Sequence, residues 1–86
     1  MNPVRIEYPC RYPVKIIGEA NDEFIDAVVA VTRRHAPELE DRDVRVSESE
    51  HGNYYSVSVM ILAQNEDQLI ELHNELKENP DVRLVI

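Results

Sequence analysis

The sequence has one cysteine, two glycines and no tryptophan among its 86 residues. A single thiol, Cys10, cannot form an internal disulfide and excludes a cysteine-rich metal site. Such sparing use of cysteine is typical of a reducing compartment, so we expect a cytoplasmic protein. No apolar run approaches the roughly 20 residues that a membrane-spanning helix needs, and the N-terminal residues do not resemble a secretory signal. We therefore expect no association with membrane.

Basic residues are also scarce, because nine lysines and arginines stand against seventeen acidic residues, for a net charge of −8. Proteins that bind nucleic acid use Lys and Arg to neutralise phosphates, so this charge argues against a nucleic acid partner unless the cations gather on one face. The length and the 43% hydrophobic content predict one soluble globular domain over residues 1–86. Within it, residues 1–11 carry Pro3 and Pro9 and read as an extended lead-in.

Hydrophobic periodicity predicts two helices. The first spans about Asp22 to Ala36, with Asn21 as its N-cap and Pro37 as its stop. The second follows Asn65, which also suits an N-cap, and ends at the Asn79-Pro80 break. We expect His35, in the last turn of the first helix, to interact with the terminal carbonyl groups of that helix.

Four segments carry the alternating or β-branched patterns that are typical of strands. They are 12–18, Asp43–Ser47, Tyr54–Gln64 and Asp81–Ile86, with Gly52-Asn53 as the turn of a protruding hairpin. The order strand, helix, strand, strand, helix, strand predicts an α+β fold, the ferredoxin-like βαββαβ sandwich. We expect a four-stranded antiparallel sheet with the first and last strands beside the third, and both helices on one face.

Strand alternation divides the sheet residues between the helix side and an open face. The helix side receives the apolar set Val14, Ile16, Val44, Val46, Tyr55, Val57, Val59, Ile61, Val82 and Leu84. The open face receives Lys15, Ile17, Arg45, Ser47, Tyr54, Ser56, Ser58, Met60, Arg83 and Val85. Three of the nine basic residues fall on this face, one on each of three strands. They predict either a site for an anion or an acidic partner or simply solubilising charges on exposed strands.

Catalytic and metal-binding constellations are not evident. The three histidines, His35, His51 and His73, belong to a helix end, a hairpin tip and a helix centre, so they do not converge as zinc ligands. Cys10 has no predicted base beside it, and Ser56 and Ser58 lack a neighbouring His–Asp pair. We therefore expect no enzyme, no metal and no cofactor.

An RNA-binding module is the alternative, because RNA-recognition domains share this element order. Those domains stack bases on aromatic side chains of the two central strands. The corresponding outward positions of the third strand here are Ser56 and Ser58, and only Tyr54 offers a ring. The sequence therefore gives little support for the stacking of RNA bases on this sheet.

Several short motifs resemble the YbeD-like family of small bacterial proteins. They are Tyr8-Pro9-Cys10, Tyr12-Pro13-Val14-Lys15-Ile16-Ile17-Gly18, Arg34-His35-Ala36-Pro37, Gly52-Asn53-Tyr54-Tyr55-Ser56-Val57-Ser58-Val59 and Pro80-Asp81-Val82-Arg83. That family is similar in fold to ACT domains, which are regulatory modules that bind amino acids and control enzymes. The resemblance implies a non-catalytic regulatory or interaction domain whose partner is an unidentified protein or a small anionic effector, and it leaves a homodimer open.

In ACT domains the ligand lies by the turn after the first strand, and the corresponding stretch here is 18–21. The resemblance implies that Gly18 allows a close backbone approach, whereas Glu19 places an acid where a ligand carboxylate would be held. The candidate interaction residues are therefore Lys15, Gly18, Arg45, Tyr54, Ser56, Ser58 and Arg83.

Overall fold

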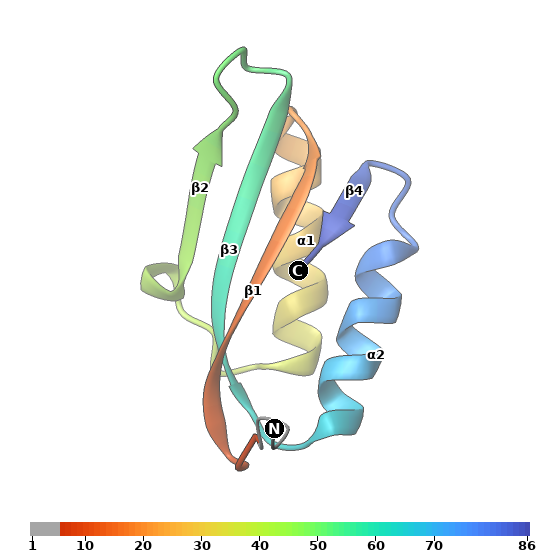
Figure 1. Cartoon of the computed structure of the whole chain (residues 1–86). Helices are drawn as coiled ribbons and strands as arrows, with labels where there is room; N and C mark the ends of the chain where they lie inside the picture. The colour runs from red at the N-terminus through yellow and green to blue at the C-terminus, as the bar shows by residue number, and fades with distance from the viewer. Residues whose placement is uncertain (1–5) are drawn as a thin grey trace, which may run out of the picture.

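The computed structural model describes residues 6–86, and its elements follow the predicted order (Figure 1). They are β1 (Cys10–Glu19), α1 (Asp22–His35), the 3-10 turn η1 (Asp41–Asp43), β2 (Val44–Glu48), β3 (Tyr54–Ala63), α2 (Glu66–Lys77) and β4 (Val82–Val85). Residues 1–5 of the expected lead-in lie outside the described part. In residues 6–86 no helix is both long and apolar enough to cross a membrane.

The four strands form one antiparallel sheet in the order β2-β3-β1-β4, as expected of a ferredoxin-like fold. Both helices lie behind the sheet, and the β2–β3 hairpin extends past its end (Figure 1). The expected position of the last strand was wrong in one respect, because β4 pairs with β1 and does not lie beside β3. β1 also starts two residues earlier than predicted, so Cys10 pairs with Ala63 within the sheet and packs against the core.

Each helix begins at the predicted cap. The Asn21 side chain accepts the N–H of Phe24 at 2.7 Å, and the Asn65 side chain accepts the N–H of Gln68 at 2.9 Å. These bonds satisfy donors that the first helical turn otherwise leaves free. The prediction for His35 was wrong, because its Nε2 lies 2.7 Å from Oε1 of Glu75 and so ties α1 to α2.

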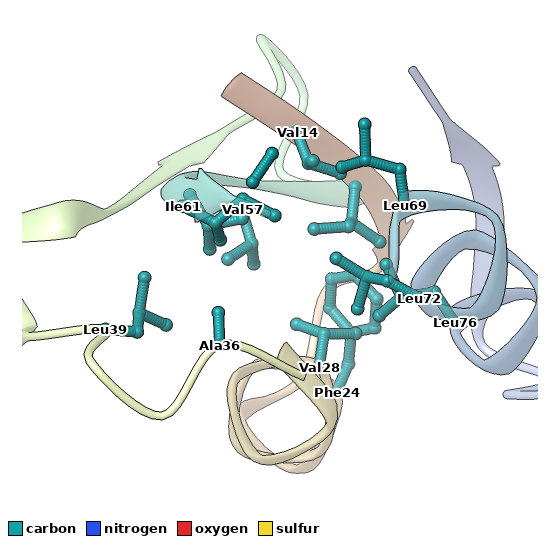
Figure 2. Packing of buried hydrophobic residues seen from close by; sticks show 13 residues of the cluster. Val14, Phe24, Val28, Ala36, Leu39, Val57, Ile61, Leu69, Leu72 and Leu76 are labelled. Atoms are coloured by element: carbon teal, nitrogen blue, oxygen red, sulfur yellow. The ribbon is translucent and has the colours of Figure 1, made fainter. Parts of the chain in front are cut away.

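The core lies between the sheet and the two helices (Figure 2). Both the sheet and the two helices contribute fully enclosed side chains. For example, Ile16 of β1, Phe24 of α1 and Leu72 of α2 are each 0% exposed. The inward residues of β1 and β3 follow the predicted alternation, with Val14, Val57, Val59 and Ile61 all buried. Burial of this apolar surface holds the helices against one face of the sheet.

Strand β4 does not follow the predicted alternation. A register shift between Ile17 and Gly18 places Gly18 opposite Val82 but Ile17 opposite Leu84. The extra residue in β4 reverses the faces of the residues that follow it. Val85 therefore packs against the core, while Leu84 is 50% exposed on the open side; the two predicted positions were exchanged.

Val46 was also predicted to be buried and is 45% exposed. It belongs to the edge strand β2, and the helix layer does not close over this edge. A hollow of about 400 Å³ lies between α1 and the start of β2, and its lining residues are Asp26, Val29, Ala30, Arg33, Asp41 and Val44.

Candidate functional site

The open face is the side of the sheet that the helices leave uncovered. Cross-strand pairing places Arg45, Ser58 and Lys15 in one row across β2, β3 and β1. Ile86 extends this row, since its backbone N–H and C=O both hydrogen-bond to Lys15. Directly opposite residues of an antiparallel pair face the same side, so two cations, one hydroxyl and one apolar side chain lie side by side.

A hollow of about 270 Å³ opens at the end of this face nearest the start of β1. We call it the basic hollow, and its lining residues are Arg11, Pro13, Arg42, Asp43, Arg45, Ser58, Val59 and Met60. Three arginines therefore share the lining of the hollow with one acid. In a chain of net charge −8, this is a local reversal of sign.

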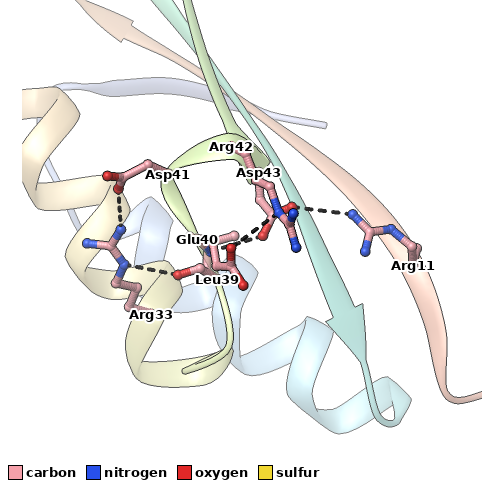
Figure 3. Close-up of polar contacts among 7 residues, drawn as sticks. All are labelled: Arg11, Arg33, Leu39, Glu40, Asp41, Arg42 and Asp43. Carbon is pink, nitrogen blue, oxygen red and sulfur yellow. Dashed lines mark hydrogen bonds and ion pairs between the residues drawn. The ribbon is translucent and has the colours of Figure 1, made fainter.

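Asp43 organises one wall of the basic hollow (Figure 3). Its Oδ2 accepts the backbone N–H of Glu40 at 2.9 Å, and its Oδ1 lies 3.4 Å from a guanidinium nitrogen of Arg11. The Glu40 hydrogen bond, with a smaller contribution from Arg11, lowers the pKa of the Asp43 carboxyl below its ordinary value. Asp43 is thus held as a carboxylate that anchors Arg11 beside the hollow.

The other two arginines of the basic hollow are less constrained. Arg42 meets Glu40 at 3.2 Å, and both side chains are largely exposed. Such exposed pairs are weak. Arg45 has no acidic partner within 4 Å among residues 6–86. The donors of Arg45 are therefore available to a ligand.

A second hollow of about 240 Å³ adjoins the basic hollow along β3. It is lined by Lys15, Ile17, Ser47, Glu48, Ser49, Tyr54, Tyr55 and Ser56. The Ser56 hydroxyl oxygen is buried there without a hydrogen-bond partner in the described residues. Three of the predicted site residues, Lys15, Tyr54 and Ser56, thus line this hollow, and none of the arginines does.

Two predicted site residues do not join these hollows. Arg83 pairs with Glu19 at the opposite end of β1 from Arg11, so its charge is already compensated. Gly18 is buried, and a Cβ on it would stand 2.4 Å from the ring of Phe24 and 2.5 Å from the carbonyl oxygen of Asp81. The close approach at Gly18 is therefore to the chain's own helix and loop.

Strand alternation places Lys15, Arg45 and Ser58 on the open face, as the structure has them, but it does not identify Arg11 and Arg42. Arg11 was placed in the lead-in, although its alternation with Pro13 and Lys15 signals the same face of the strand. Arg42 precedes β2 in a turn, where strand alternation gives no direction to a side chain.

Most of the exposed large apolar side chains lie on the same face. Among residues 6–86, seven large apolar residues are exposed, and four of them take outward positions of the sheet: Tyr54, Leu62, Leu84 and Ile86. The acids of the two helices lie on the other side of the molecule. The open face therefore combines cationic, hydroxyl and apolar groups.

This fold is that of a small ACT-like domain of the ferredoxin-like class. The ACT domain of a GTP pyrophosphokinase from Chlorobium tepidum superposes with a TM-score of 0.70 at 18% identity, over 90% of this chain and 83% of the other. Protein HP0495 of Helicobacter pylori superposes equally well, with a TM-score of 0.70 at 20% identity over 98% of this chain and 88% of the other.

The chain belongs to the family described as "Protein of unknown function (DUF493)", whose model matches residues 4–86. Its relatives include the UPF0250 proteins of Pseudomonas paraeruginosa and Serratia proteamaculans. The first is 44% identical and covers 100% of this chain and 94% of the relative; the second is 42% identical and covers 94% and 91%. The family resemblance and the ACT-like fold predicted from the sequence are confirmed.

Proposed function

We propose that the protein is a non-catalytic interaction domain that docks a partner protein on the open face of its sheet. One observation carries this proposal: uncompensated cations and most of the exposed large apolar side chains share the one sheet face that no helix covers. Leu84 lies opposite Ile17 and two residues before Ile86, so these three apolar side chains are neighbours on this face. Exposed apolar groups rimmed by polar ones are typical of protein-binding surfaces. The partner should present acidic groups beside an apolar patch, because charge complementarity steers and orients docking.

A regulatory role agrees with this reading. The ACT domain of the Chlorobium tepidum GTP pyrophosphokinase has the same fold, and such a fold suits a module that acts on another protein. The turn after β1 is a weaker candidate for the contact, since Phe24 and the Asp81 carbonyl occupy the space beside Gly18.

Site-specific photo-crosslinking in bacterial cells tests the proposal. Leu84 and Ile70 form a matched pair, because they are apolar and 50% and 48% exposed on the sheet face and on α2 respectively. With benzoylphenylalanine in place of each residue in turn, we expect a discrete protein adduct from position 84, several-fold more abundant than any from position 70.

Three other outcomes would contradict the proposal. Equal adducts from both positions, or an adduct from position 70 alone, would mean that the sheet face is not the docking surface. An adduct from position 84 that ribonuclease destroys and protease does not would favour the RNA-binding alternative.

A further inference from the structure

We propose that the basic hollow is a specific subsite for a carboxylate on a short aliphatic stem, supplied by an acidic side chain of the docked partner. This inference rests on the proposed function for the source of the carboxylate. The subsite itself is a property of this chain and can be tested without a partner.

The basic hollow carries more positive than negative charge. Arg11, Arg42 and Arg45 line the hollow, and Asp43 is the one acid among its lining residues. Both carboxylate oxygens of Asp43 already have partners, the Glu40 N–H and Arg11. Arg42 is paired with Glu40. The excess of positive charge that an incoming anion would meet therefore rests on Arg45, whose guanidinium has no acidic partner in the described residues.

The arginines also provide hydrogen-bond donors that suit an oxyanion. A guanidinium presents its N–H groups as a planar fork that matches a carboxylate or a phosphate. Arg42 and Arg45 flank Asp43 and Val44 in the chain, and Arg11 reaches the hollow from β1. Because the arginines approach from different strands and a turn, they can bind one oxyanion from more than one side.

The walls of the hollow select between oxyanions. Pro13 of β1 and Met60 of β3 are cross-strand neighbours on the open face, and both line the hollow with apolar groups. Its volume of about 270 Å³ accommodates a carboxylate with a few methylene groups. Methylene groups gain free energy from burial against Pro13 and Met60, whereas inorganic phosphate has no such group to bury. The hollow therefore favours an aliphatic carboxylate.

Titration of the whole chain with glutarate, inorganic phosphate and neutral glutaramide, followed by amide chemical shifts, tests the subsite. We expect glutarate to shift the amides of Ser58 and Met60 in a saturable way, with a lower Kd than phosphate, and glutaramide to leave them unchanged. The glutarate Kd should rise several-fold with added salt, because the arginines are exposed to solvent.

Two variants with the same loss of charge separate a site from general attraction. Arg45→Gln removes the unpaired guanidinium of the hollow, and we expect it to raise the glutarate Kd at least tenfold. Arg83→Gln removes an arginine that is paired with Glu19 outside the hollow, and it should change the Kd less than twofold.

Three outcomes would overturn the subsite. Phosphate binding as tightly as glutarate would contradict the carboxylate preference. Equal effects of the two variants on the glutarate Kd, or chemical-shift changes scattered over the whole surface, would mean that glutarate is attracted nonspecifically and that the hollow is not a binding site. The crosslinking result at Leu84 is independent of all three outcomes, so the docking surface and the carboxylate subsite can fail separately.

Discussion

The two faces of the sheet carry alternate residues of the same strands but differ in burial. On the helix side, Ile16 and Val57 are 0% exposed and pack directly against the helices. On the open side their neighbours Ile17 and Ser58 remain partly accessible, and cations stand beside them. One face of the sheet is therefore buried in the core, whereas the other stays accessible to solvent.

The two faces should differ most in the effect of truncating an apolar side chain. Leu72 is 0% exposed between α2 and the sheet, so we expect Leu72→Ala to lower the free energy of unfolding by about 2–5 kcal/mol. Leu84→Ala, on the open face, should cost less than about 1 kcal/mol because its side chain is half in water. Urea unfolding measures both values, and similar losses would mean that the open face contributes to the core.

We expect a smaller difference in the free energy of unfolding between variants at Gly18 and at Ser58. A methyl group on Gly18 would collide with Phe24 and the Asp81 carbonyl, and we expect Gly18→Ala to cost about 1–3 kcal/mol through overpacking. Ser58→Ala adds no atoms to a packed region and should change the free energy of unfolding by less than about 0.5 kcal/mol. If Gly18→Ala unfolds like the wild type, the turn after β1 has room for a ligand after all.

The helix layer should also differ from the open face in how its contribution to stability depends on pH. The hydrogen bond from His35, with help from Arg34, lowers the pKa of Glu75 below its ordinary value of 4.5. Because the folded state prefers the ionised carboxylate, this contribution to stability is present above that value and is lost as pH falls through the lower folded-state pKa. We expect Glu75→Gln to be less stable than the wild type near pH 6, and the gap to close in acid.

Urea midpoints measured across this pH range test the Glu75 prediction. Glu71→Gln is the matched control, since Glu71 is an exposed acid of α2 with no ion pair in residues 6–86. A gap for Glu75→Gln that does not change with pH, or an equal gap for Glu71→Gln, would show that the contact between α1 and α2 contributes nothing specific.

Local patterns in the sequence predicted most of the fold, since caps, helix stripes and strand alternation are local signals. Asn21 and Asn65 cap as expected, and the inward residues of β1 and β3 follow their alternation. The exchange of Leu84 and Val85 could not be predicted in this way, because a bulge depends on how β4 meets β1 in space. The pairing of His35 with Glu75 joins residues 40 positions apart and has no local signal.

The candidate site was only partly predictable for a similar reason. Lys15, Arg45 and Ser58 share a row because strand alternation and pairing are regular. Arg83 was expected beside them, but the bulge in β4 and its pairing with Glu19 remove it from that group. Arg42 enters the basic hollow from a turn, where only the folded chain determines its position.

We propose that the open face docks an acidic partner through its unpaired cations. This docking is tested by the affinity for the protein crosslinked through position 84, compared between Arg45→Glu and Lys77→Glu. Both changes reverse one exposed charge that has no ion pair in residues 6–86, on the sheet face and on α2 respectively. We expect Arg45→Glu to weaken binding at least tenfold with unchanged folding, and Lys77→Glu to bind like the wild type. Undiminished binding by Arg45→Glu, or an equal loss in both variants, would mean that the cations of the open face do not hold the partner.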